Sequence, residues 1–145
     1  MRYSLVLLAV LFATGCALFD NNDGATSDIN RQWQQWQAEE IDDYSFNLTI
    51  NCFCPEEYRG PFRVVVRDGA VTSMTFGDAP ARPEVERRTI DDLFVLLQDA
   101  DRSDADEINV TYDERYSFPA DFFIDYDFNI ADEEMGIVVT NFVME

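Results

Sequence analysis

The sequence predicts an α+β domain in which an antiparallel sheet of about five to six strands carries two helices on one face. Several segments alternate apolar and polar residues, which is the period of a strand covered on one side only. Two other segments repeat apolar residues at spacings of three and four, which is typical of amphipathic helices. Their order along the chain is α-βββ-α-βββ, and 145 residues suffice for one such domain with a short appendage.

The first helix is predicted to follow Asp28, which is a suitable N-cap, and to end near Glu40. Ile29, Trp33 and Trp36 follow at spacings of four and three. A tryptophan stripe of this kind is more often buried core than a ligand platform, because such rings dominate core burial.

The first strand is predicted over residues 44–51, YSFNLTIN, where every second residue is apolar. A hairpin follows, because Asp68 and Gly69 tolerate positive φ and join FRVVVR to AVTSMTF. Pro80 and Pro83 then break regular structure.

The second helix is predicted over residues 90 to about 100, where Thr89 and Asp92 approximate a capping box. Its apolar positions recur at helical spacing: Ile90, Leu93, Phe94, Leu97 and Ala100. Three strand candidates complete the domain: EINVTYD, ADFFIDYDF and GIVVTNFVM.

The amino terminus is typical of an exported lipoprotein. Residues 1–15 combine a positive start with a short apolar run, which indicates a signal peptide. The ATGC that ends at Cys16 resembles the bacterial lipobox, although Ala13 stands where leucine is usual. The resemblance implies lipid on Cys16, which would anchor the protein to a bacterial cell-envelope membrane, outer or cytoplasmic. An ordinary secretory signal is the alternative. Residues 16–27 are predicted to form a flexible tether, and residues 28–145 the domain.

The charge of the chain limits its partners. The net charge is −19, with no histidine. Such a surface repels nucleic acid and favours a protein partner with a basic surface, although acidity is also a common solubility or saline adaptation. The lack of histidine removes Ser-His-Asp and Cys-His catalytic arrangements and every histidine metal site. No Walker loop, glycine-rich dinucleotide turn or nucleophile elbow occurs, and carboxylate pairs are too common in so acidic a chain to indicate a hydrolase. We therefore expect no catalysis and no cofactor.

Cys52 and Cys54 continue the even-numbered series of the first strand, so they are predicted to face the core, with Pro55 ending the strand. An exported compartment favours a disulfide between them. Extended residues two apart have Cα atoms about 6.5 Å apart, near the upper limit for a disulfide, so the bond is tight and a bend at Phe53 would help it. A redox pair, a metal site with carboxylates, and free buried thiols remain open alternatives.

The acidic segment DYDFNIADEEMG begins as a calcium loop does. Asp125, Asp127 and Asn129 occupy alternate positions, and Asp132 is a further oxygen ligand. Ile130 replaces the glycine that such loops need at position 6, so a solvated acidic turn is the favoured interpretation.

Several motifs together resemble a family of small bacterial lipoproteins defined only as a domain of unknown function, family 6174. They are CFCPEEYRGPFRVVVRDGAV, TIDDLF, INVTYDERYSFPADFFIDYD and NIADEEMG. The resemblance implies an exported, tethered domain with a recurrent Cys-x-Cys, and it implies no activity. Its positions in this chain are Cys52, Cys54, Pro55, Asp68, Gly69, Pro119 and residues 132–136.

The combined interpretation is a lipid-anchored cell-envelope protein that presents an acidic binding or structural domain. The alternative is thiol-disulfide redox chemistry or calcium binding, at the cysteine pair or at residues 125–134.

Overall fold

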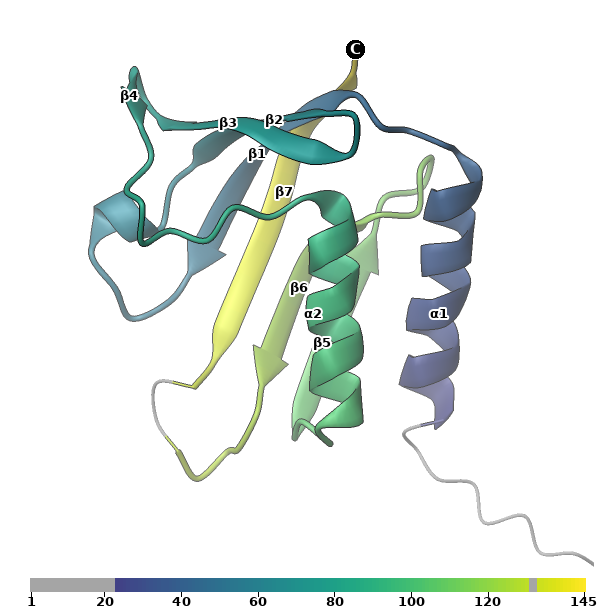
Figure 1. Ribbon diagram of the computed structural model, residues 1–145. Helices are drawn as coiled ribbons and strands as arrows, with labels where there is room; N and C mark the ends of the chain where they lie inside the picture. The colour runs from purple at the N-terminus through teal and green to yellow at the C-terminus, as the bar shows by residue number, and fades with distance from the viewer. Residues whose placement is uncertain (1–22, 131–132) are drawn as a thin grey trace, which may run out of the picture.

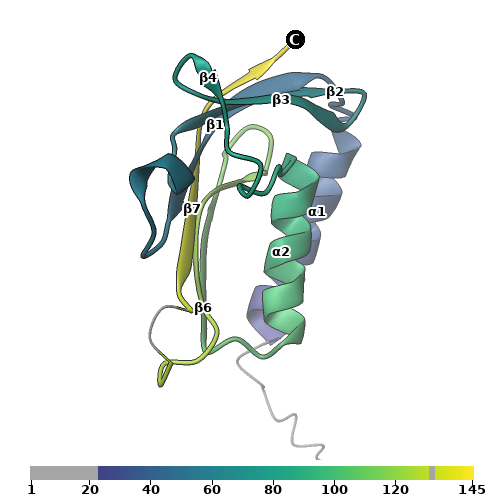
Figure 2. The same ribbon diagram turned by 60° about the vertical axis from the view of Figure 1, so that its left-hand side comes forward.

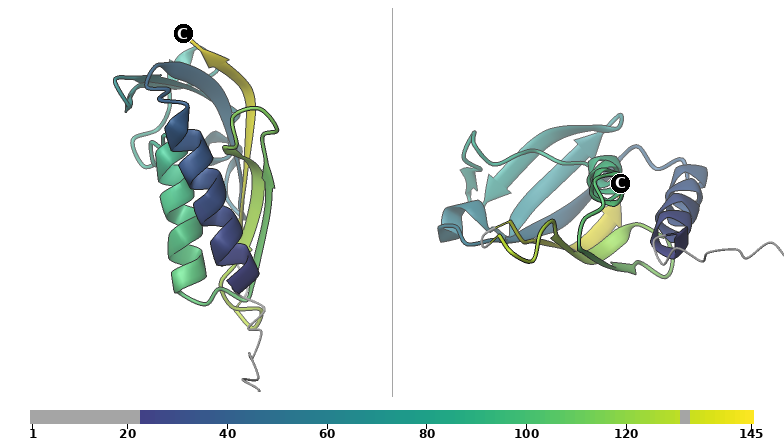
Figure 3. Two further views of the ribbon diagram at one scale, coloured as in Figure 1. Left: turned by 90° about the vertical axis from the view of Figure 1, so that its right-hand side faces the viewer. Right: turned by 90° about the horizontal axis from the view of Figure 1, so that it is seen from below.

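The computed structural model describes residues 23–130 and 133–145, which form an antiparallel sheet with two helices on one side (Figures 1 and 3). The strands lie in the order β4-β3-β2-β1-β7-β6-β5. The helices are α1 (Asp23–Ala38) and α2 (Ile90–Arg102), with one 3₁₀ turn, η1 (Glu56–Tyr58). The strands are β1 (Tyr44–Asn51), β2 (Phe62–Arg67), β3 (Ala70–Phe76), β4 (Ala79–Pro80), β5 (Glu107–Tyr112), β6 (Pro119–Asp125) and β7 (Met135–Met144). The predicted α+β class is confirmed.

The central strand of the sheet is β1, which pairs with β2 on one side and β7 on the other. Leu48 lies opposite both Phe62 and Val139 in this register, so apolar residues of three strands meet on the inner face. The predicted turn between β2 and β3 is confirmed, with φ of 48° at Asp68 and 70° at Gly69.

The core lies between this inner face and α2. Each apolar position predicted for α2 is fully buried, and Thr89 with Asp92 forms the predicted capping box. Phe46 and Leu48 of β1 are also fully buried, and burial of each such side chain contributes about 1.5–3 kcal/mol.

The first helix packs beside α2 on the same face of the sheet (Figures 2 and 3). The ring of Trp33 meets that of Phe94 edge-on, with centroids 5.0 Å apart. Trp36 is 3% exposed, and its indole Nε1 donates a hydrogen bond of 2.6 Å to Asp91 of α2. The predicted core role of the tryptophans is confirmed, and α1 is thereby fixed against α2.

The start of the first helix differs from the sequence prediction. Helix α1 begins at Asp23, so Asp28 lies inside it and is not the N-cap. Residues 23–27 therefore belong to the helix and not to the tether, because no proline interrupts a helix that Ile29 already anchors in the core.

A seventh strand was not predicted. Ala79 and Pro80 form the two-residue β4 at the edge of the sheet. Proline is tolerated there because an edge strand leaves its outer N–H positions without ladder partners.

The predicted signal peptide, residues 1–15, and the predicted lipid site Cys16 lie outside the described residues. Within the described part of the chain, no helix has the length and apolar character needed to cross a membrane.

Candidate functional site

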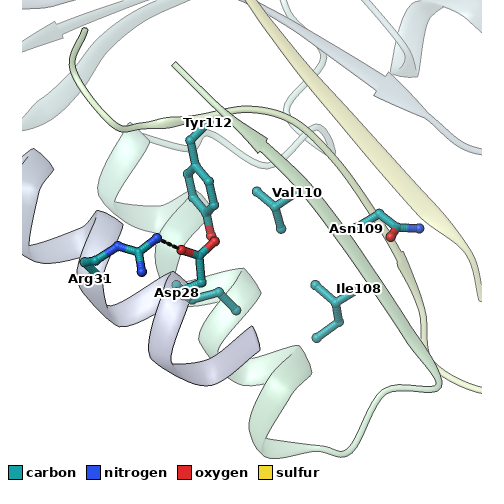
Figure 4. A pocket seen from close by; sticks show the side chains of 7 residues that line it. Asp28, Arg31, Ile108, Asn109, Val110 and Tyr112 are labelled. Atoms are coloured by element: carbon teal, nitrogen blue, oxygen red, sulfur yellow. Dashed lines mark hydrogen bonds and ion pairs between the residues drawn. The ribbon is translucent and has the colours of Figure 1, made fainter. Parts of the chain in front are cut away.

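A cavity of about 470 Å³ lies between the first half of α1 and the edge strand β5 (Figure 4). Its apolar lining comes from Ile29 of α1 and from Ile108 and Val110 of β5. Ile108 and Val110 alternate along β5, so both point toward the helices, and they are half-buried. The volume falls in the usual range for ligand sites in proteins.

The polar residues that line this cavity are Tyr112, Asp28, Arg31 and Asn109 (Figure 4). Asp28 and Arg31 form an ion pair one turn apart on α1. The hydroxyl of Tyr112 is buried and has no hydrogen-bond partner, while its ring stacks on Phe94 with centroids 6.3 Å apart. Burial raises the pKa of Tyr112, the charge of Asp28 raises it further, and Arg31 partly offsets both. The hydroxyl is therefore a neutral donor and acceptor that lacks a partner.

The two edges of the sheet differ. At one edge β4 is two residues long and contains Pro80, which leaves little backbone to pair. At the other edge β5 is six residues long and contains no proline. The long edge is the one that borders the cavity.

An acidic groove of about 420 Å³ lies at the opposite end of the domain from the start of α1 (Figure 1). Carboxylates dominate its lining, which comprises Glu39, Glu40, Ile41, Asp42, Asp43, Met144 and Glu145. Backbone hydrogen bonds fix its shape, because Glu145 N–H donates to the Asp43 carbonyl and Gly69 N–H to the Asp42 carbonyl, each at 3.0 Å.

The groove holds its carboxylates in different ways. Asp43 accepts a hydrogen bond of 2.9 Å from the backbone N–H of Asp68. Glu145 pairs with Arg67, and a hydrogen bond from the Ser45 hydroxyl is the main cause of its lowered pKa. The remaining carboxylates of the lining, Glu39, Glu40 and Asp42, lie in the loop after α1 and add to the negative charge of this end of the domain.

Cys52 and Cys54 lie at disulfide-bonding distance, with their Cα atoms 5.4 Å apart. The prediction that they continue β1 and face the core is wrong. The strand ends at Asn51, and the chain bends there. Both side chains are half-buried and do not belong to the core, whereas Phe53 is 94% exposed. The ladder with β7 also ends there, since Asn51 pairs with Gly136 at the start of β7.

The side-chain oxygens of the predicted calcium ligands Asp125 and Asp127 accept hydrogen bonds from neighbouring backbone N–H groups. Asp125 accepts a hydrogen bond of 3.1 Å from the N–H of Asp127. Asp127 accepts one of 2.9 Å from the N–H of Asn129, and Asp132 lies outside the described residues. Among residues 23–130 and 133–145 no cluster of three or more acidic, cysteine or histidine ligands can hold a metal ion. These contacts are those of consecutive Asx turns.

Sequence reasoning missed both the cavity and the groove. The run Glu39, Glu40, Asp42 and Asp43 was visible as a local concentration of charge. Nothing in the pattern of β5 showed that Tyr112 would face the first half of α1, because that contact depends on how α1 packs against α2.

Comparisons with known proteins place the chain in a family without an assigned role. No match to the chain was found among curated proteins or among solved structures. The model of a family described as "Family of unknown function (DUF6174)" matches residues 28–144, which covers the whole sheet, most of α1, and α2. The chain therefore belongs to the family of unknown function DUF6174.

Proposed function

We propose that this protein is a non-catalytic binding module, exported and anchored by lipid on Cys16, that recognises a basic surface of a partner protein. The observation that carries the proposal is the acidic groove of about 420 Å³ between the end of α1 and the end of β7. A concave surface lined mainly by carboxylates favours arginine and lysine side chains, and the net charge of −19 accelerates the approach of a basic partner.

The position of the groove supports a tethered module. Cys16 precedes α1 in the chain, and α1 begins at one end of the domain and ends at the other (Figure 1). An anchor before α1 leaves the groove on the end away from the attachment point, where a partner can reach it.

Crosslinking in cells tests the proposal. The lipidated protein would be crosslinked, its captured proteins identified, and the binding of each purified candidate measured at two salt concentrations. We expect a basic partner whose affinity falls as salt rises, because screening weakens contacts between exposed charges.

A pair of double variants locates the binding surface. Glu39→Lys with Glu40→Lys reverses two charges beside the groove, and Asp78→Lys with Glu84→Lys makes the same change in net charge elsewhere. We expect the first pair to weaken binding by about tenfold or more and the second to change it little. An equal loss of affinity in both double variants, or no loss of affinity in either, contradicts a specific role for the groove.

The anchor has its own test. Labelling of growing cells with an alkyne fatty acid should mark the wild-type protein and the variant with serine at positions 52 and 54. Cys16→Ser should remove the label and release the protein from the membrane fraction. A labelled Cys16→Ser variant, or an unlabelled wild type, contradicts the anchor.

A further inference from the structure

We propose that β5 accepts an additional strand, so that an extended basic segment of a partner protein docks in the cavity between α1 and β5. This contact is separate from the acidic groove and does not require it. It follows from the backbone of β5, the shape of the cavity and the hydroxyl of Tyr112.

The backbone of β5 is available on its outer side. It pairs with β6 alone, from Glu107 opposite Asp125 to Tyr112 opposite Pro119. In the described part of the chain, no backbone hydrogen bond joins Glu107–Tyr112 to a segment other than β6. Every second residue of an edge strand directs its N–H and C=O outward, which is the template that strand addition uses.

Proteins usually protect such an edge with proline, with very short strands or with a covering element. The β4 edge is protected by the first two devices, and the β5 edge has neither. Helix α1 runs beside β5 but leaves a cavity of about 470 Å³ between them. Apart from the register shift at Thr111 and Tyr112 in its ladder with β6, the β5 edge lies open beside this cavity, which is the arrangement that a docked strand requires.

The cavity suits alternate side chains of an extended segment. Ile29, Ile108 and Val110 provide an apolar surface on the helix side of β5. An added strand directs every second side chain to that side, so small apolar residues at alternate positions would contact this surface. Because β5 spans six residues, the docked segment would be of about the same length.

The buried hydroxyl of Tyr112 lies at the polar end of the cavity, near the Asp28 carboxylate (Figure 4). A buried polar group without a partner is unfavourable, and after a side-chain shift that opens the hydroxyl to the cavity, a carbonyl of the docked segment would satisfy it. A basic side chain of the segment would approach Asp28, which pairs with Arg31 in this structure.

Charge selects a basic partner segment over a second copy of this chain. The net charge is −19, so two copies repel each other. Pairing of two β5 strands would also bring Asp28 and Glu107 of each copy toward those of the other. A segment that alternates arginine with a small apolar residue avoids this repulsion and supplies the alternation that β5 needs.

The test uses the full chain purified in detergent and a capped peptide of about eight residues that alternates valine with arginine. Hydrogen exchange followed by mass spectrometry reports which amides the peptide protects. We expect protection of residues 107–112, because their outward amides gain hydrogen bonds, with slowing of about tenfold or more at saturation.

Two controls separate strand pairing from simple charge attraction. The same peptide with N-methyl groups on alternate residues keeps its charge but cannot form the ladder, so it should not protect β5. Tyr112→Phe should lower the affinity for the unmodified peptide by about three- to tenfold, because one hydrogen bond between protein and peptide is lost. Tyr116→Phe, which removes a hydroxyl from the loop after β5, should leave binding within about twofold.

Each outcome decides the proposal. Protection of residues 107–112 that N-methylation abolishes, and that Tyr112→Phe weakens, supports it. Protection of residues 39–43 with β5 unchanged overturns it and leaves the proposed function standing. Equal binding of the N-methylated peptide, or the absence of binding at about 1 mM, also overturns it. The proposed function fails by a separate result: the crosslinked partner binds the groove variant as tightly as the wild-type protein. Circular dichroism of each variant confirms that a loss of binding is not a loss of folding.

Discussion

The hydroxyl of Tyr44, at the start of β1, accepts a hydrogen bond of 3.0 Å from the backbone N–H of Ile90, the first residue of α2. Tyr44 is 2% exposed and Ile90 is fully buried. The first N–H groups of a helix have no partner within the helix, and the capping box satisfies the N–H groups of Thr89 and Asp92. Neither bond of the capping box reaches the Ile90 N–H, so the central strand supplies the acceptor for it.

Removal of this hydroxyl should destabilise the domain. Tyr44→Phe leaves the Ile90 N–H buried without a partner, so we expect a loss of about 1–3 kcal/mol in the free energy of unfolding. Urea denaturation monitored by tryptophan fluorescence measures it. Tyr116→Phe is the control, because its half-buried ring keeps the same packing after the change. A loss no larger than that of the control contradicts the role given to Tyr44.

Stability should also fall in alkali. Burial raises the pKa of Tyr44 above the usual value of about 10, and the charges of Asp91 and Asp92 raise it further. The folded protein thus holds this proton more tightly than the unfolded chain does. The contribution of protonated Tyr44 to the free energy of unfolding is complete below about pH 10 and is lost progressively as the pH rises above that value. Urea unfolding between pH 8 and 11 should show the decline, and the decline should be smaller in Tyr44→Phe.

Two glycines with positive φ should respond differently to alanine. A Cβ on Gly60, whose φ is 88°, would lie 2.7 Å from the Leu48 carbonyl oxygen and from the Phe62 nitrogen. A Cβ on Gly77, whose φ is 57°, would meet nothing within 4 Å. We expect Gly77→Ala to cost about 1–2 kcal/mol from backbone strain alone, and Gly60→Ala to cost clearly more. Similar melting temperatures for the two variants would contradict the close packing around Gly60.

Neighbouring aspartates of the 125–134 loop should respond oppositely to asparagine. Burial raises the pKa of Asp125, the hydrogen bond from the Asp127 N–H partly offsets this, and the charges of Glu134, Asp106 and Glu107 raise it further. The net effect makes the charged form of Asp125 less favourable in the folded protein than in the unfolded chain. Hydrogen bonds from Asn129 lower the pKa of Asp127, so its charged form is favourable. We expect Asp125→Asn to raise the melting temperature by a few degrees at pH 7 and Asp127→Asn to lower it.

The pH dependence follows from these directions. The penalty at Asp125 is absent below its usual pKa of about 4 and appears as the pH rises, so the gain in Asp125→Asn should vanish in acid. The contribution of Asp127 is present above about pH 4 and is lost as the pH falls further. The same melts with millimolar calcium and with chelator test the calcium hypothesis, because a ligand of the native state must stabilise it. A calcium-dependent rise that Asp125→Asn abolishes would support a site in the loop.

Loss of the cysteine pair should cost little stability. A bond between Cys52 and Cys54 closes a very short loop, so replacement of both by serine should cost about 1–2 kcal/mol. Thermal unfolding measures the loss, and intact mass with alkylation before and after reduction shows whether the bond is present. A function that disappears while the melting temperature stays unchanged would favour the redox alternative.

Local patterns predicted most of the secondary structure. The alternation in residues 44–51 gave the bounds of β1, and the capping box at Thr89 and Asp92 gave the start of α2. These features involve neighbours in the chain, where propensity and hydrogen bonding act directly. The bend after Asn51 was not predicted, because the alternation continued through both cysteines and only the end of the β7 ladder stopped the strand.

The sequence by itself determined the α+β class, the central strand, the hairpin turn and α2, because each depends on short-range periodicity or on turn chemistry. It also determined the net charge of −19. Tertiary structure alone decided which residues share a site. The packing of Trp33 on Phe94 fixes α1 beside α2, and that position puts Asp28 near the hydroxyl of Tyr112 along an open edge strand. Such contacts join residues far apart in the chain, and no local pattern encodes the distance between them.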